Sequence, residues 1–205
     1  MRILFAGGGT AGHINPALAI AGTVREREPD AAILYVGAKG GMEERLVPKA
    51  GFDFKSVTIS GFQRKPSWAN LKKNVKTVVH LFTSTEEAKR IIKEFQPDVC
   101  VGTGGYVSGP VIREAMRLGI PSLIHEQNAF PGVTNKALSK KAAYTMLAVQ
   151  DAKKYLPSTA RCVLTGNPVR PAVIRAEREA SRKKLGLDER PLILSFGGSL
   201  GARRV

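Results

Sequence analysis

Residues 7–13 read GGGTAGH and stand between the apolar run ILFA at 3–6 and the helix-like segment PALAIA at 16–21. A strand, a glycine turn and a helix start form a site for an anion. Glycine lets the backbone approach a ligand closely, and the first amide groups of a helix lack partners within it. Thr10 adds a hydroxyl and His13 an imidazole at this turn. The stretch therefore predicts a Rossmann-like βα unit with a phosphate-binding turn.

The glycine spacing of this stretch also matches the fingerprint of dinucleotide-binding proteins. In a nicotinamide-binding unit the next strand ends in an acidic residue about 20 residues further on, which binds the ribose hydroxyls. The strand predicted here at 32–36 is instead followed by Gly-Ala-Lys at 37–39. Because Lys39 could bind a 2′-phosphate, an NADP-linked oxidoreductase remains an alternative. A plain βα turn is another, and the imidazole of His13 argues against it.

The rest of the chain continues the alternation of strands and helices. Apolar runs predict strands at 54–59, 99–101, 120–124, 144–149, 162–164 and 192–196. Helical patterns lie at 43–49, 70–95, 111–118, 134–141 and 175–185. The strands are continuously apolar, which indicates an α/β fold with a parallel sheet covered on both faces. Ligands of such sheets bind at the carboxyl ends of the strands, where the polar motifs at 7–13, 102–108 and 125–128 fall.

Residues 166–171 (GNPVRP) contain two prolines and predict a crossover between domains. We therefore expect an N-terminal Rossmann-like domain at 1–165, followed at 166–205 by the crossover and the first βα element of a second Rossmann-like domain. That element includes a third glycine turn, GGSLGA at 197–202. Its strand has no sheet to join, so the sequence is expected to be truncated and residues 175–205 loosely held.

The chain carries 32 Lys and Arg against 17 Asp and Glu, a net charge of +15, which predicts an acidic partner. The basic residues are spread along the chain without a zinc finger or an aromatic RNA-binding motif, so no nucleic acid is expected. Cys100 and Cys162 lie in predicted strands, as small buried hydrophobes rather than a disulfide framework or a metal site. No signal peptide and no membrane span of roughly 18 apolar residues is found, which predicts a cytosolic chain that could still lie on a membrane.

Six motifs occur in a characteristic order along the chain. They are GGTAGH (8–13), ISG (59–61), GGYVSGP (104–110), HEQN (125–128) with TNK (134–136), GNPVR (166–170) and GGSLGA (197–202). Together they resemble the MurG family of glycosyltransferases. Members of that family transfer N-acetylglucosamine from UDP-GlcNAc to undecaprenyl-linked muramyl-pentapeptide, the lipid precursor of peptidoglycan.

The resemblance implies a two-domain GT-B hexosyltransferase that inverts the sugar and needs no metal or cofactor. The N-terminal domain would hold the lipid acceptor and the C-terminal domain most of the nucleotide, at the cytoplasmic face of the bacterial cell membrane. The implied role is peptidoglycan biosynthesis in cell wall growth and cell division. A non-catalytic nucleotide- or lipid-binding module of the same fold remains the alternative.

The resemblance also implies which residues bind the donor. By motif, the contacts to UDP-GlcNAc would be Thr10, Ala11, Gly12, Asn128, Arg170 and Ser199. The family usually has glycine at the position of Ala11, whose Cβ changes the space but leaves its amide free. The family's motifs for uracil and the sugar hydroxyls lie beyond Val205, so these 205 residues alone are expected to be inactive and to bind UDP-GlcNAc poorly.

Inverting transfer needs a base that takes the proton of the attacking hydroxyl. His13 is the ionisable side chain of the first turn, and a helix N-terminus disfavours the imidazolium form. We predict that His13 is the base or a positioning group beside the reacting centre, with helix capping as the alternative. On the acceptor side, His125 beside Glu126 is a candidate to orient the acceptor, whereas His80 is expected to be inert.

Three further residues each have two interpretations. Arg170 has the fork geometry for a diphosphate and would stabilise departing UDP, or it forms a surface ion pair. Asn128 could bind a sugar hydroxyl, or it caps the turn after its strand. Tyr106 faces the same cleft, either as an acceptor contact or as a packing residue.

The predicted helix at 70–95 has an apolar stripe beside basic residues. The stripe consists of Leu71, Val75, Val78 and Phe82, next to Lys72, Lys73 and Lys76 and after Trp68. Such a stripe usually faces the core. Basic flanks and a tryptophan are also what an interfacial helix uses on anionic lipid, so a membrane-facing patch is the alternative.

Overall fold

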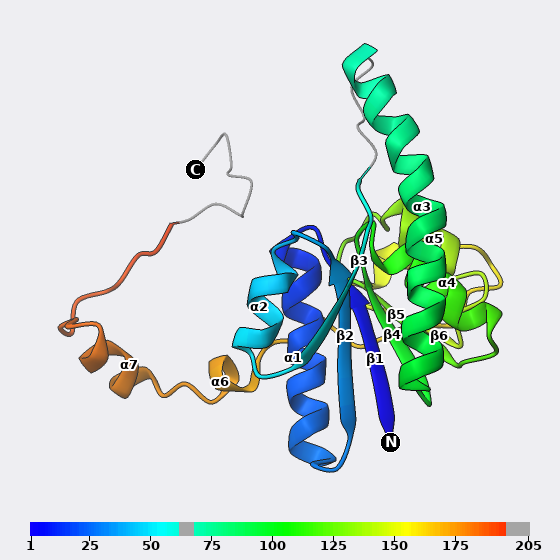
Figure 1. Ribbon diagram of the computed structural model, residues 1–205. Helices are drawn as coiled ribbons and strands as arrows, with labels where there is room; N and C mark the ends of the chain where they lie inside the picture. Colours follow the sequence, from blue (N-terminus) through cyan, green and yellow to red (C-terminus); the bar gives the residue numbers. More distant parts are fainter. Residues whose placement is uncertain (62–67, 196–205) are drawn as a thin grey trace.

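Across the described residues, seven parallel strands form one sheet in the order β3-β2-β1-β4-β5-β6-β7. The structure is a computed structural model that describes residues 1–61 and 68–195, without the side chains of 68–79, 81 and 82 (Figure 1). The strands are β1 (Arg2–Gly7), β2 (Ala32–Ala38), β3 (Asp53–Val57), β4 (Val99–Gly104), β5 (Ser122–Glu126), β6 (Tyr144–Leu147) and β7 (Cys162–Leu164). The helices are α1 (Ala11–Arg27), α2 (Glu43–Lys49), α3 (Trp68–Phe95), α4 (Ser108–Arg117), α5 (Val133–Leu138), α6 (Pro171–Ile174) and α7 (Arg178–Lys184), with a 3₁₀ helix η1 (Gln150–Tyr155).

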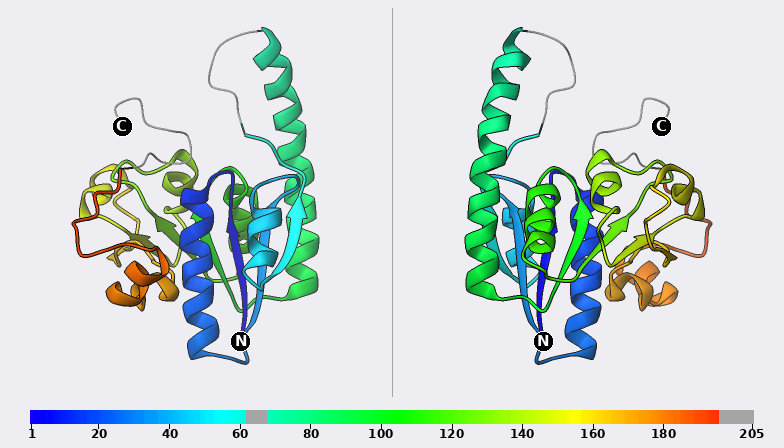
Figure 2. Two further views of the ribbon diagram at one scale, coloured as in Figure 1. Left: turned by 90° about the vertical axis from the view of Figure 1, so that its left-hand side faces the viewer. Right: turned by 90° about the vertical axis from the view of Figure 1, so that its right-hand side faces the viewer.

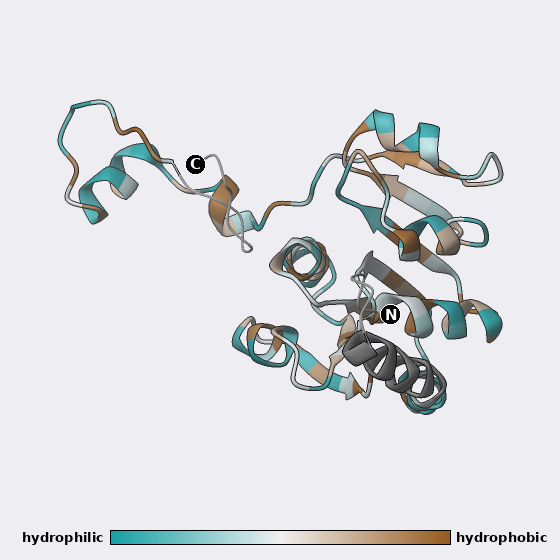
Figure 3. Cartoon of the chain, turned by 90° about the horizontal axis from the view of Figure 1, so that it is seen from above, coloured by the Kyte–Doolittle hydropathy of each residue, from teal (hydrophilic) through white to brown (hydrophobic). Residues whose placement is uncertain are grey.

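Helices cover both faces of this sheet, as predicted (Figures 2 and 3). On β1, Leu4 joins a core cluster that includes residues of α3 and α4, whereas Phe5 joins the cluster formed with α1 and α2. This alternation buries both faces of the central strand and explains why the strand is apolar throughout. The predicted α/β class with a parallel sheet is therefore confirmed.

The chain order of the strands reverses between β1 and β4. From β1 the chain proceeds through β2 to β3 on one side, and from β4 to β7 on the other. In open parallel sheets, ligands bind in the crevice at this switch point, outside the carboxyl ends of the strands. The glycine turns that follow β1 and β4 therefore flank the expected binding crevice.

Several element boundaries differ from the sequence prediction. Helix α4 begins at Ser108 rather than 111, because a proline such as Pro110 is tolerated in the first turn of a helix. The strand predicted at 144–149 ends at Leu147, and the 3₁₀ helix η1 that follows was not predicted. Cys162 is only half-buried because it lies on the edge strand β7, whereas Cys100 is fully buried.

Over its described residues, 192–195, the strand predicted at 192–196 is not formed. Residues 192–195 have no regular structure, and Ile193 is 90% exposed, since none of the described strands lies beside them. Helix α7, within the charged helix predicted at 175–185, has no buried residue and lies away from the sheet (Figures 1 and 3). The third glycine turn at 197–202 lies outside the described residues.

The side chains that would decide the role of the stripe on α3 also lie outside the described part of the structure. These are Trp68, Leu71, Lys72, Lys73, Val75, Lys76, Val78 and Phe82. The carboxyl-terminal part of α3 packs into the core through Ala88, Ile91 and Ile92. Among the residues that the structure describes, no helix has both the length and the apolar character needed to cross a bilayer.

Candidate functional site

The first glycine turn joins β1 to α1 and leaves backbone amides free. Thr10 takes the N-cap position of α1 in an extended conformation, and its hydroxyl makes no capping hydrogen bond. Among the described residues, the amides of Thr10, Ala11 and Gly12 have no acceptor, as expected for the start of a helix. The first turn of α1 also contains no acidic residue. This end of α1 therefore presents unpaired N–H groups and the positive end of the helix dipole.

The other amides of the turn are already bonded within the protein. Gly8 N donates to Gly104 O at 3.3 Å, and Gly9 N donates to Glu43 Oε2 at 3.3 Å. Gly9 has φ +83°, a conformation that favours glycine, and a Cβ there would lie 2.6 Å from the ring of Tyr106. The glycines at 8 and 9 therefore allow close packing, while the amides at 10–12 are available to a ligand.

Glu43 is a buried carboxylate beside this turn that sequence reasoning did not identify as a site residue. It is fully buried at the start of α2 and also accepts a hydrogen bond from Ala38 N at 2.8 Å. A Cβ on Gly8 would overlap its carboxylate, and one on Gly41 would lie 2.7 Å from it. The glycines at 37 and 41 were the available sequence signal, because a Cβ at either position would collide with the Glu43 side chain.

The second glycine turn follows β4 and packs directly on the first. Gly105 has φ +81°, and a Cβ there would overlap the carbonyl oxygen of Gly8. The register between β1 and β4 shifts here, since Ala6 pairs with Gly102 and Gly7 with Gly104. Thr103 is thereby left without a partner on β1, as in a β-bulge.

His13 lies against β4 in the first turn of α1 and is half-exposed. Its Nδ1 is 3.0 Å from Thr103 O and 3.2 Å from Gln127 Oε1. Thr103 Oγ1 donates to His13 O at 2.8 Å, so ring and backbone are both fixed to the same residue. The ring therefore bonds to the sheet and does not cap α1.

His125 is fully buried at the end of β5, and burial lowers its pKa. Its Nε2 is 3.0 Å from Gly166 O in the predicted crossover, and its Nδ1 is 3.0 Å from Gln127 Nε2. The ring thus joins the end of the sheet to residue 166 and faces away from solvent.

Glu126 is buried as well, and its charge is balanced by amide groups rather than by a cation. Oε1 accepts from Asn128 N and Nδ2, both at 2.9 Å, and Oε2 accepts from Gly132 N at 3.0 Å and Asn135 Nδ2 at 2.9 Å. Asn128 itself is exposed, with its amide nitrogen committed to this turn. Glu126 thereby holds the loop after β5 against α5.

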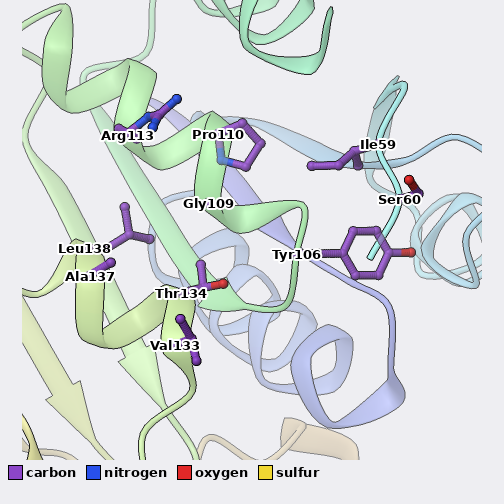
Figure 4. A pocket seen from close by; sticks show the side chains of 10 residues that line it. All are labelled: Ile59, Ser60, Tyr106, Gly109, Pro110, Arg113, Val133, Thr134, Ala137 and Leu138. Atoms are coloured by element: carbon purple, nitrogen blue, oxygen red, sulfur yellow. The ribbon is translucent and has the colours of Figure 1, made fainter. Parts of the chain in front are cut away.

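Tyr106 borders a cavity of about 280 Å³ next to the second glycine turn (Figure 4). The pKa of its phenol is raised, first by burial and then by the charge of Glu43. The cavity is lined by Ile59, Ser60, Tyr106, Gly109, Pro110, Arg113, Val133, Thr134, Ala137 and Leu138. Most of these side chains are apolar, and Arg113 is the only cationic residue among the lining residues.

One predicted donor contact, Arg170, lies away from this edge of the sheet, and another, Ser199, cannot be placed. Arg170 is exposed at the start of α6 and lines a hollow on the outer face of α1 with Asn15, Leu18 and Gly22. Ser199 lies outside the described residues. The structure therefore gathers Thr10, Gly12, His13 and Tyr106 around the switch point, with Asn128 on the neighbouring loop.

The sheet order and the two glycine turns define a Rossmann-like α/β domain with unpaired helix-start amides at its switch point. Comparison with known proteins gives the particular family. Residues 3–147 match the glycosyltransferase family 28 N-terminal domain, and the chain belongs to that family.

Curated relatives extend the likeness over the whole chain. A UDP-N-acetylglucosamine--N-acetylmuramyl-(pentapeptide) pyrophosphoryl-undecaprenol N-acetylglucosamine transferase of Acetivibrio thermocellus is 48% identical over 206 residues, covering 100% of this chain and 55% of the relative. A protein of the same name from Clostridioides difficile is 46% identical over 208 residues, covering 100% of this chain and 50% of its own length. The chain thus spans about half the length of the curated relatives it matches.

Solved structures agree with this assignment. The crystal structure of Acinetobacter baumannii MurG is 31% identical, with a TM-score of 0.64, covering 84% of this chain and 47% of that one. The predicted resemblance to MurG proteins is thereby confirmed. A UDP-GlcNAc 2-epimerase from Neisseria meningitidis, 14% identical with a TM-score of 0.58, covers 91% of this chain and 51% of that one, and shows a shared fold only.

Proposed function

We propose that this chain supplies the acceptor-binding domain of a MurG-type glycosyltransferase, with residues 1–165 as that domain and 166–205 leading into a donor-binding domain. The reaction would move N-acetylglucosamine from UDP-GlcNAc to undecaprenyl-linked muramyl-pentapeptide. The proposal rests on one observation: the free helix-start amides and His13 lie together at the switch point. The chain that holds them is 48% identical to the Acetivibrio thermocellus transferase.

The amides of Thr10, Ala11 and Gly12 would bind a phosphate oxygen, because an unpaired helix N-terminus favours negative charge. Asn128 lies at the same edge with its carbonyl oxygen available to a hydroxyl group. Arg170 lies away from the turn, so its assignment to the donor rests on the motif alone, as does that of Ser199. Charge on the departing UDP would then be stabilised by fixed N–H dipoles.

His13 would act as the base. In an inverting transfer, the acceptor hydroxyl oxygen forms a bond to the anomeric carbon while the bond to UDP breaks and the imidazole takes the hydroxyl proton. The half-exposed ring is held at the crevice by Thr103 and Gln127, as a positioned base requires. His125 and Glu126, both buried, would support this edge from within rather than contact the acceptor.

The apolar cavity beside Tyr106 would accommodate part of the lipid-linked acceptor. Its lining is largely apolar, and Arg113 offers a positive charge to an anionic head group. The net charge of +15 fits a peripheral position on the anionic cytoplasmic face of the membrane. These features favour a lipid-linked acceptor over a small soluble one.

The test is a fusion of residues 1–205 to the remaining C-terminal part of the Acetivibrio thermocellus relative. We expect the fusion to transfer radiolabelled N-acetylglucosamine from UDP-GlcNAc to a lipid-linked muramyl-pentapeptide, and the His13→Ala variant to lose most of this turnover. A fusion that binds both substrates without transfer would identify a non-catalytic module. Oxidation or reduction of an NADP cofactor would instead support the oxidoreductase alternative.

A further inference from the structure

Gln127 lies between the two histidines of the site and contacts both. It follows β5, and its side-chain amide reaches His13 on α1, Thr103 at the end of β4 and His125 on its own strand. Its Oε1 is 3.2 Å from His13 Nδ1, and its Nε2 is 3.0 Å from His125 Nδ1. One amide group therefore joins a half-exposed imidazole to a buried one.

The surrounding carbonyl groups determine which terminal atom of the Gln127 amide is the nitrogen and which is the oxygen. Gln127 Nε2 lies 3.0 Å from Thr103 O and 3.1 Å from His125 O, and both oxygens can only accept hydrogen bonds. The nitrogen must therefore occupy this position, and Oε1 must face His13. Thr103 O is available because the register shift at the end of β4 leaves this residue without a partner on β1.

The same reasoning fixes the tautomers of the two histidines. His13 Nδ1 faces two acceptors, Thr103 O and Gln127 Oε1, so it carries the hydrogen. His125 Nε2 faces Gly166 O and carries a hydrogen, which leaves its Nδ1 to accept from Gln127 Nε2. The two neutral rings thus hold their hydrogens on opposite nitrogens.

We infer that Gln127 is a positioning residue that holds His13 as the Nδ1–H tautomer and leaves its Nε2 lone pair free to take a proton. Among the described residues, His13 Nε2 has no hydrogen-bond partner, and both partners of Nδ1 are uncharged oxygens. The use of that lone pair in catalysis rests on the proposed function, whereas the tautomer is a property of the chain itself. Through His125, the same amide links His13 to residue 166 in the crossover.

Among the described residues, few charged groups lie close to the rings of His13 and His125. Glu126, the residue after His125, is the charged group that acts on the buried ring, and its carboxylate is occupied by four amide hydrogen bonds. No described carboxylate bonds to His13. Within the described part of the chain, the orientation of the half-exposed His13 ring therefore depends on Thr103 and Gln127.

The test is nitrogen NMR of the imidazole rings in the 205-residue chain near pH 7.5, where its three histidines keep the spectrum simple. We expect His13 to carry hydrogen on Nδ1 and His125 on Nε2. Gln127→Leu leaves Thr103 O as the remaining acceptor that faces Nδ1, so the fraction of the Nδ1–H form in His13 should fall. Gln127→Glu keeps an acceptor for His13 Nδ1, so the hydrogen should stay on that nitrogen, and its carboxylate lies beside both rings, so it should favour the imidazolium form of each.

The matched control is Gln150→Leu, the same change at an exposed glutamine, which should alter neither the His13 nor the His125 ring. The ring of His80 serves as an internal reference in the same spectra. An Nε2–H tautomer of His13 in the unmodified chain, or an unchanged His13 ring in Gln127→Leu, would overturn the inference. In the transferase fusion, Gln127→Leu should lower kcat with little change in KM. An inactive unmodified fusion would contradict the proposed function while leaving the NMR result to decide the role of Gln127.

Discussion

Contact between the two glycine turns predicts a large stability difference between two similar substitutions. Gly105 and Gly40 both have positive φ, +81° and +74°, so alanine at either position adopts an unfavourable backbone conformation. This costs about 1–2 kcal/mol in each case. A Cβ at Gly105 would in addition overlap the carbonyl oxygen of Gly8, whereas nothing lies within 4 Å of a Cβ at Gly40.

The overlap is with backbone, which cannot rotate away as a flexible side chain would. Forcing the turns apart should cost about 1–3 kcal/mol of overpacking. It should also cost about 1 kcal/mol for the hydrogen bond from Gly8 N to Gly104 O. We therefore expect Gly105→Ala to lose about 3–6 kcal/mol of unfolding free energy and Gly40→Ala about 1–2 kcal/mol.

Urea unfolding followed by circular dichroism measures both variants against the unmodified chain. The comparison isolates the contact between the turns because the backbone conformations are alike. Equal losses in the two variants, or a Gly105→Ala chain as stable as the parent, would refute the view that the two turns are packed in direct contact.

Three further predictions address chemistry, membrane binding and pH. In the transferase fusion, His13→Ala should lower kcat with little change in KM for UDP-GlcNAc, because proton acceptance acts on the transition state; a large rise in KM instead would assign it to binding. Replacing Lys72, Lys73 and Lys76 by Ser should weaken sedimentation with acidic vesicles by about 1 kcal/mol per charge, and unchanged binding would favour the core interpretation. Because burial lowers the pKa of His125, the unfolded chain binds its proton more readily, so stability should fall as pH drops below about 6.5. Urea titrations at pH 5 and 7.5 should show this loss reduced in His125→Gln; an identical pH dependence would assign it to other groups.

The sequence predicted the sheet because its strand signals are local. The run at 99–101 is apolar throughout and lies between a helix end and a glycine turn. Such a run indicates a strand buried on both faces, whichever strands lie beside it, so the assignment as a strand follows from composition. The order of the strands does not follow in this way. The apolar residues 192–195 lie in no strand, since an apolar run becomes a strand only beside a partner.

The contacts that organise the site depend on strand order and were therefore not predicted. His13 meets Thr103 across 90 positions and Gln127 across 114, contacts that exist only because β4 lies beside β1 and β5 beside β4. Gln127 was identified only as part of a motif, and Glu43 only as the start of a helix. No local pattern indicates that the Gln127 side chain is turned toward the glycine turns, and the glycines at 37 and 41 were the one local signal for Glu43.

Ala11 shows why one position of the glycine turn tolerates a side chain. The positive φ of the turn is at Gly9, whereas Ala11 begins the regular helix α1, where a Cβ is accommodated and the amide remains unpaired. The amide of Gly9 is already occupied by Glu43, so a negative charge sits on that side of the turn. A bound phosphate should therefore lie toward residues 10–12, away from the carboxylate, and the substitution at 11 leaves that set of donors complete.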